Sequence, residues 1–219
     1  MGLDIYFHKF KSNDNVPREI NSRDDWQVVY EECDNQSRKA LKKAYDKSVK
    51  ELRAASKENY DKVYNRVIKR ICKFSTYPEF HYKELGVDYD YQSGKYTYTS
   101  VPVTKFLEVR DNIIKEHYAP DIAYFRKVNF VYAYFSNKLI DEVAWVERED
   151  LIDLIDRCEK VLKDNDLAET LLPTQDGFFF GSTEYGKWYF QDVRDCKKQM
   201  SKLLKGLKDD ELVYVVMSW

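Results

Sequence analysis

The sequence lacks most of the features from which a chemical activity is usually inferred. Its 219 residues include only 7 Gly, 5 Pro and 3 His, and no phosphate-binding loop, nucleophile elbow, zinc-protease or deaminase signature occurs. The four cysteines, at positions 33, 72, 158 and 196, lack the close pair typical of structural zinc, so we expect reduced and mostly buried thiols. His8, His81 and His117 have no metal-ligand spacing. We therefore predict no catalytic residue, no metal and no cofactor.

Long apolar runs are also missing. No run approaches the roughly 18 residues of a membrane-spanning helix, and the start MGLDIYFHKF has an aspartate at position 4 and no apolar core typical of a secretion signal. What the chain does contain is 12 Phe, 18 Tyr and 4 Trp, enough apolar area to exclude a disordered protein. We expect a folded intracellular protein with no membrane partner.

Charge is segregated along the chain although the net charge is only −2. Residues 38–73 carry 13 Lys or Arg against 4 Asp or Glu, whereas residues 141–169 carry 11 acids against 4 bases. Two solvated helix faces are the default interpretation. Alternatively, helix 38–73 binds nucleic acid by releasing phosphate counterions, or the charges attract a complementary protein. The candidate basic surface consists of Lys62, Arg66, Lys69, Arg70 and Lys73.

A long helix is predicted in the basic segment. Neither Gly nor Pro occurs between Pro17 and Pro78, and from Leu41 to Phe74 apolar residues recur with an eleven-residue period. A helix over residues 37–74 would be about 57 Å long at 1.5 Å per residue. Because this exceeds the width of a compact domain, the helix must project, break or pack against a second copy, so a homodimer through the long helix is one alternative.

The other segments predict an α+β protein. Tyr89, Tyr91, Ser93-Gly94, Tyr96 and Tyr98 have the alternation of a β-hairpin. Helices are expected over 104–116, 121–137, 147–163 and 184–206, and short strands at 143–145 and 178–180. Both chain ends, LDIYFHKF and ELVYVVMSW, have strand-like patterns. We predict a small, mostly antiparallel sheet that includes both chain termini and is covered by helices, with a long projecting basic helix and a Tyr-rich β-hairpin.

We treat residues 1–219 as a single domain. Within it, residues 30–105 form an insertion or appendage on a body made of residues 1–12 and 106–219. Residues 174–188 are the most unusual local stretch, with three Gly and three Phe. The favoured interpretation is a strand-to-helix connection. The alternative is a ligand site that uses Ser182, Thr183, Glu184, Tyr185 and Trp188, which would require a concave surface and a perturbed carboxylate.

Several segments resemble a family of uncharacterised proteins found in bacteriophages, prophages and some bacterial genomes, whose members begin Met-Gly-Leu-Asp-(Met or Ile)-Tyr. The segments of this chain that carry the resemblance are MGLDIY, YFRKVNFVYAYF (124–135), VEREDLIDLIDRCEKVL (146–162), LLPTQDGFFFGSTEYGKWYFQDV (171–193) and the final Ser218-Trp219. The resemblance covers about half of the chain and excludes the middle, residues 30–105. It implies an accessory protein in the bacterial (host) cytoplasm, and it implies no reaction, substrate or catalytic residue.

The leading hypothesis is thus a non-enzymatic phage or prophage accessory protein that binds a host or phage protein, or another macromolecule, as an inhibitor. The first alternative is a nucleic-acid-binding protein that uses helix 38–73. The second is a small-molecule binder or enzyme centred on residues 174–188.

Overall fold

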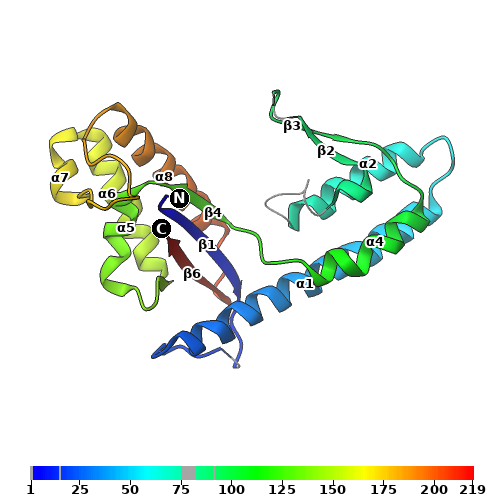
Figure 1. Ribbon diagram of the computed structural model, residues 1–219, viewed down its shortest axis with the longest axis horizontal. Helices are drawn as coiled ribbons and strands as arrows, with labels where there is room; N and C mark the ends of the chain where they lie inside the picture. The colour runs from blue at the N-terminus through cyan, green and yellow to red at the C-terminus, as the bar shows by residue number, and fades with distance from the viewer. Residues whose placement is uncertain (1, 15, 75–81, 91) are drawn as a thin grey trace. The chain divides into compact units, whose positions relative to one another are not determined.

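The computed structural model describes residues 2–14, 16–74, 82–90 and 92–219 (Figure 1). His81 and Tyr91, both named in the sequence interpretation, lie outside these residues. The chain has the expected α+β fold and divides into two compact units. The first unit contains Met1–Glu32 and Asp121–Trp219, and the second contains Cys33–Pro120.

The first unit is built on a four-stranded antiparallel sheet in the order β4-β1-β6-β5. Its strands are β1 (Asp4–Lys11), β4 (Ala123–Arg126), β5 (Val143–Val146) and β6 (Glu211–Ser218). The two terminal strands pair over their whole length, from Asp4 opposite Ser218 to Lys11 opposite Glu211. The prediction that both chain ends share one sheet as neighbours is confirmed.

The two faces of this sheet are covered differently because successive side chains of a strand alternate between faces. One face carries Ile5, Phe7 and Val215, fully buried in the main core with side chains of α6 (Arg148–Lys163) and α8 (Lys187–Gly206). Figure 1 shows these helices in yellow and orange. The other face is covered by an aromatic cluster of Phe10, Trp26, Tyr30, Trp145 and Tyr214, in which Trp26 and Trp145 have ring centroids 5.0 Å apart.

Helix α6 confirms the prediction for 147–163, and its start has a local cause. The Glu147 side chain accepts the backbone N–H of Asp150, and the Asp150 carboxylate accepts the N–H of Glu147 at 2.9 Å. This reciprocal capping box satisfies two N–H groups that no helical carbonyl can reach. The predicted strand at 143–145 is confirmed as β5.

Two predictions in the first unit are wrong. Residues 121–137 form β4 and then α5 (Asn129–Phe135) instead of one helix, because Ala123 and Phe125 pair with β1 and point into the core. Residues 178–180 form a turn instead of a strand, with the Phe180 N–H bonded to the Gly177 carbonyl at 3.0 Å. The last helix begins at Lys187 with Gly186 as its N-cap, so Ser182 and Thr183 do not cap it.

The second unit contains the basic segment, and the continuous helix predicted over 37–74 is broken. Helix α1 spans Arg23–Ala54, and its first ten residues belong to the first unit. Helix α2 spans Tyr60–Ile71. Ser56 and Asn59 lie in the turn between them, where such residues compete with helical hydrogen bonds. The break lets both halves of the apolar stripe share one core, in which Leu41 and Val67 are fully buried.

The rest of the second unit follows the prediction closely. Helix α4 spans Val103–Lys115, and the hairpin consists of β2 (Val87–Asp90) and β3 (Lys95–Tyr98). Gly94 occupies the turn at φ +66°, and the rings of Tyr89 and Tyr96 pair across the strands at 4.8 Å. The short elements of the second unit are the 3₁₀ turns Cys72–Phe74 and Lys83–Leu85, and those of the first unit are α7 (Ala168–Leu171) and the 3₁₀ turns Ser136–Lys138 and Asn165–Leu167.

Two expectations about composition can be compared with the structure. Cys33, Cys158 and Cys196 are buried and Cys72 is half-buried, all as free thiols. Over the described ranges, no helix has both the length and the apolar content needed to cross a membrane.

Candidate functional site

The five residues of the predicted basic surface lie on α2 and just after it, but three of them are engaged within the second unit. Arg66 and Arg70 both pair with Glu51, at 3.1 and 2.9 Å. The Lys69 ammonium lies over the Tyr98 ring, 5.6 Å from its centroid. Of the five, Lys62 and Lys73 are exposed and have neither an ion pair nor a cation–π contact with the described residues.

A larger set of unpaired cations lies on α1. Its members share exposure to solvent and the absence of any ion pair to the described part of the chain: Lys39, Lys42, Lys43, Lys47, Lys50 and Arg53. At 100° per residue, Lys39, Lys43, Lys47 and Lys50 lie opposite the buried Leu41, Tyr45 and Leu52, and Lys42 and Arg53 lie at one edge of that exposed side. The carboxylate of Asp46, on the same side, pairs with Arg110 at 3.6 Å. We call these six residues the α1 cation row. In the sequence, the α1 cation row could have been found from the Lys residues that recur every three to four positions between the apolar ones.

Arg38 lies next to this row but is not part of it. Its Nε donates to the His117 carbonyl at 2.9 Å, and its guanidinium lies 3.7 Å from Asp34. The His117 ring is 2.7 Å from the Ser37 hydroxyl, so these side chains hold the end of α4 to α1 within the unit. Arg38 is therefore a structural cation.

The two units carry net charges of opposite sign. The second unit carries 18 Lys or Arg and 12 Asp or Glu, a net +6, and the first carries 18 and 26, a net −8. A polyanion is thus attracted to one unit and repelled by the other.

The other predicted site, residues 174–188, borders a hollow of about 240 Å³ at the start of α8. We call it the α8 hollow. It is lined by Arg126, Lys127, Val128, Asn129, Phe130, Gly181, Ser182, Glu184, Gly186, Trp188, Tyr189 and Asp192. Three predicted residues, Ser182, Glu184 and Trp188, are thereby brought together. Thr183 and Tyr185 are not in the lining, because the Thr183 carbonyl and Tyr185 hydroxyl bond to Thr174 instead.

The wall of the α8 hollow is held by two specific contacts. Gly181, at φ +92°, lies against Lys127, such that a Cβ on the glycine would come 3.1 Å from the Lys127 Cβ. The amide of Asn129, which is 3% exposed, donates to the Ser182 carbonyl at 2.9 Å. These contacts join the loop before α8 to the first residue of α5.

Asp192 is the residue of the α8 hollow that sequence reasoning missed. It is half-buried, and no described residue forms a hydrogen bond or ion pair with its carboxylate. Burial, together with the negative charge of Asp195, raises the pKa of Asp192. Its position four residues after Trp188 places both side chains on one helix face. The concave surface and the perturbed carboxylate that a ligand site requires are therefore both present.

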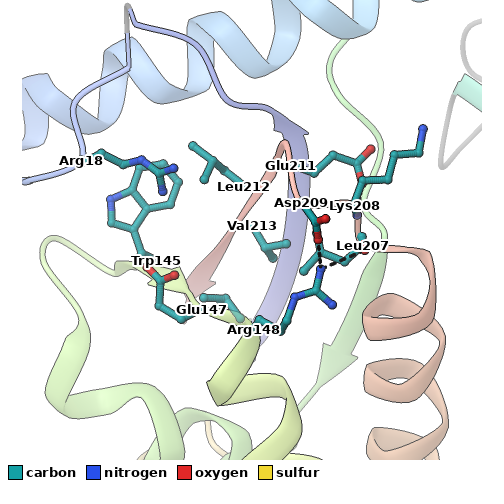
Figure 2. A pocket seen from close by; sticks show the side chains of 11 residues that line it. Arg18, Trp145, Glu147, Arg148, Leu207, Lys208, Asp209, Glu211, Leu212 and Val213 are labelled. Atoms are coloured by element: carbon teal, nitrogen blue, oxygen red, sulfur yellow. Dashed lines mark hydrogen bonds and ion pairs between the residues drawn. The ribbon is translucent and has the colours of Figure 1, made fainter.

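Two further hollows of the first unit have internally paired charges. One, of about 230 Å³, lies between β5, β6 and the end of α8 (Figure 2). There Arg148 donates to the Leu207 carbonyl at 3.1 Å and points toward Asp209 at 3.5 Å, and Glu211 pairs with Lys9 at 2.8 Å.

The second of these hollows, of about 420 Å³, contains the pairs Lys138–Asp150 and Arg157–Asp153. In the second hollow these pairs leave little charge for a ligand, whereas the first also has Arg18 and Lys208 in its lining, neither paired with a described carboxylate.

Within the described ranges, no cluster of His, Cys, Asp and Glu has the arrangement of a metal site. No protein family, curated protein or solved structure matches the chain.

Proposed function

We propose that the protein is a non-enzymatic binding protein that holds nucleic acid on the α1 cation row. The observation that carries the proposal is the accumulation of six exposed, unpaired cations on one face of one helix, in the unit that bears the net positive charge. Because none of them forms an ion pair with a described carboxylate, these side chains can contact the phosphates of a polyanion without breaking an existing pair, and the counterions of those phosphates are released to solution.

The arrangement favours contacts to the phosphate backbone over base recognition. From Lys39 to Arg53 the row spans about 21 Å at 1.5 Å per residue, long enough to contact several phosphates of a duplex. Lysine binds phosphate as a point charge, and the row contains one arginine and no Asn or Gln able to read a base edge. The expected binding is therefore independent of sequence and strongly dependent on salt.

Fluorescence anisotropy with a labelled 20-base-pair duplex and a single strand of equal length tests the proposal. If four cations reach phosphates, log Kd against log salt has a slope near 3.6, so affinity falls about 150-fold between roughly 50 and 200 mM salt. The variant K39Q/K43Q/K50Q removes three of the six cations and should lower the slope by up to about 2.7.

Arg66→Gln is the matched control, since it also removes an exposed cation from a helix of this unit, but one that is already ion-paired with Glu51. It should change the slope by well under 1. Equal effects of the triple variant and this control, or a wild-type slope near zero, would rule out the α1 cation row as the nucleic-acid surface.

The biological setting is part of the proposal and is supported by the resemblance alone. An accessory protein of a phage or prophage that acts in the bacterial cytoplasm would meet host or phage nucleic acid directly. The two segments that carry most of that resemblance, 146–162 and 171–193, lie in the first unit. The α1 cation row lies in the second unit, in the part of the chain that the resemblance does not cover.

A second candidate function is inhibition or recruitment of a host or phage protein through the loop before α8. Phe178 is 96% exposed and Trp188 is 77% exposed, and exposed aromatic side chains are frequent anchors of protein interfaces. A pull-down from nuclease-treated host lysate should recover one stoichiometric protein with the wild type and lose it with Phe178→Ala. The same yield with F178A would exclude Phe178 as the anchor.

A further inference from the structure

The α8 hollow combines a carboxylate, an aromatic ring and a free volume in one place. Trp188 and Asp192 lie one turn apart on α8, and both line the hollow of about 240 Å³ together with Glu184. Neither carboxylate has an ion pair among the residues that the structure describes. A ring face next to an unpaired carboxylate is an arrangement suited to a cation, because both groups attract positive charge.

The chain itself supplies a first indication of this preference. The ammonium of Lys187 lies 5.7 Å from the centroid of the Trp188 ring, within the range of a cation–π contact. Lys187 does not line the hollow. The ring therefore already attracts a cation of its own chain, which a ligand would have to displace or share.

Two cations, Arg126 and Lys127, line the hollow as well, and both are exposed to solvent. The Arg126 guanidinium lies 4.0 Å from Asp4, and the Lys127 Cε lies 3.1 Å from the position of a Cβ on Gly2. Neither Asp4 nor Gly2 is part of the lining. The aliphatic part of Lys127 packs against Gly181, so it contributes wall. Among the lining charges that have no ion pair with a described residue, the two carboxylates of Glu184 and Asp192 outnumber the one ammonium of Lys127, so the unpaired charge of the lining is net negative.

We infer that the α8 hollow binds an organic cation, an alkylammonium or guanidinium group, between the Trp188 ring and the carboxylates of Asp192 and Glu184. Desolvation of Asp192 without a counter-charge is unfavourable, and an entering cation would remove that cost. The hollow is large enough for a side chain such as arginine or for a small free amine. The site is independent of the α1 cation row, which belongs to the other unit.

The test is an NMR titration that follows the indole N–H of Trp188, assigned with Trp188→Leu. The probes are n-butylammonium, acetyl-arginine amide, the pentapeptide Gly-Gly-Arg-Gly-Gly, and acetyl-citrulline amide as a neutral isostere. We expect the cationic probes to shift the resonance saturably and citrulline to bind at least about tenfold more weakly. Binding of all three cations indicates a small-amine site, whereas binding of the peptide alone indicates a basic segment of a protein.

The variants separate the site from general charge. Asp192→Asn and Trp188→Leu should each weaken binding by about 3- to 30-fold. Asp195→Asn, on the same helix but outside the lining, should change it by less than about twofold. Lys187→Gln should strengthen binding because it removes the competing cation.

The inference is overturned if citrulline binds as well as arginine, if D192N and D195N behave alike, or if no probe shifts the Trp188 resonance. Far-UV circular dichroism of each variant confirms that the fold is retained, which is expected because Trp188 is 77% exposed. None of these outcomes depends on nucleic-acid binding, so the two proposals can fail separately.

Discussion

Replacing Gly86 by alanine should destabilise the second unit, because two independent costs coincide at this residue. Gly86 ends the 3₁₀ turn Lys83–Leu85 in the left-handed region, at φ +63°. Its carbonyl accepts the backbone N–H of Thr99 at 2.8 Å, which joins the start of β2 to the chain leaving β3. A Cβ at this position would lie 2.1 Å from the Thr99 carbonyl oxygen.

The magnitude follows from these two features. A left-handed conformation costs a residue with a Cβ about 1–2 kcal/mol. The 2.1 Å contact is with a backbone atom, so the chain must move by roughly 1 Å, which weakens the Gly86–Thr99 hydrogen bond and costs about 1 kcal/mol more. We therefore expect a loss of about 2–3 kcal/mol, which for a unit of this size lowers the Tm by roughly 10–20 °C.

Gly94→Ala is the matched control. Gly94 has almost the same dihedral angle, φ +66°, but the nearest atom to its added Cβ is the Tyr89 hydroxyl at 3.7 Å. It should lose only the conformational cost of about 1–2 kcal/mol and keep the share that the steric clash adds in G86A. Thermal and urea unfolding followed by circular dichroism, with hydrogen exchange of the hairpin amides as a local probe, measures both. Equal losses in G86A and G94A would refute the steric argument.

Three further outcomes are expected. Burial acts to raise the pKa of Glu51, but its hydrogen bonds and ion pairs with Arg70 and Arg66 lower it below 4.5 overall. The ionised carboxylate therefore stabilises the fold above pH 4.5. Glu51→Gln should cost under about 1 kcal/mol at neutral pH, and urea unfolding should show this difference disappearing as the pH falls through the lowered pKa. A constant difference would contradict this sign. The Tyr45 hydroxyl is buried with no hydrogen-bond partner among the described residues, so Tyr45→Phe should leave stability unchanged or raise it by about 1 kcal/mol; a clear loss in urea unfolding would show that the hydroxyl is bonded. Burial raises the pKa of the Cys72 thiol to about 12, so it should react with a disulfide reagent far more slowly in the native than in the unfolded protein at mild alkaline pH. Rapid native reaction of one thiol would contradict this.

The elements predicted correctly from the sequence are those in which one periodicity runs from start to end. Helix α6 has unbroken three-to-four spacing from Leu151 to Val161, and the terminal strands alternate between the two faces of one sheet. In such segments the local pattern and the tertiary packing require the same conformation. The hairpin was predictable for the same reason, since Gly94 supplies the positive φ that its turn requires.

The wrong predictions occur where tertiary pairing overrides a local pattern. The pattern of residues 121–137 predicts one helix, because the pairing of Ala123–Arg126 with β1 is not visible in the sequence. Nor is the positive φ of Lys127, +59°, which separates the strand from the helix. The stripe from Leu41 to Phe74 is real, and of the three alternatives for so long a helix the chain adopts the break, so that the two halves of the stripe pack into one core.

The candidate sites were predictable only in part, for a related reason. The excess of Lys and Arg over 38–73 is visible in the sequence, but which cations are neutralised depends on Glu51 meeting Arg66 and Arg70 across the break between helices. Likewise, Trp188 stands out by its type, whereas Asp192 becomes notable only once folding buries its carboxylate.

The opposite charges of the two units make a competition experiment decisive for both proposals. A polyanion such as heparin should displace nucleic acid from the α1 cation row, because both compete for the same unpaired cations. It should not displace acetyl-arginine amide from the α8 hollow, which belongs to a unit of net −8 and presents carboxylates to its ligand. If heparin at constant ionic strength released both ligands equally, after correction for acetyl-arginine amide bound to heparin itself, binding at the two sites would be coupled, and the α8 hollow would have to be abandoned as a separate site.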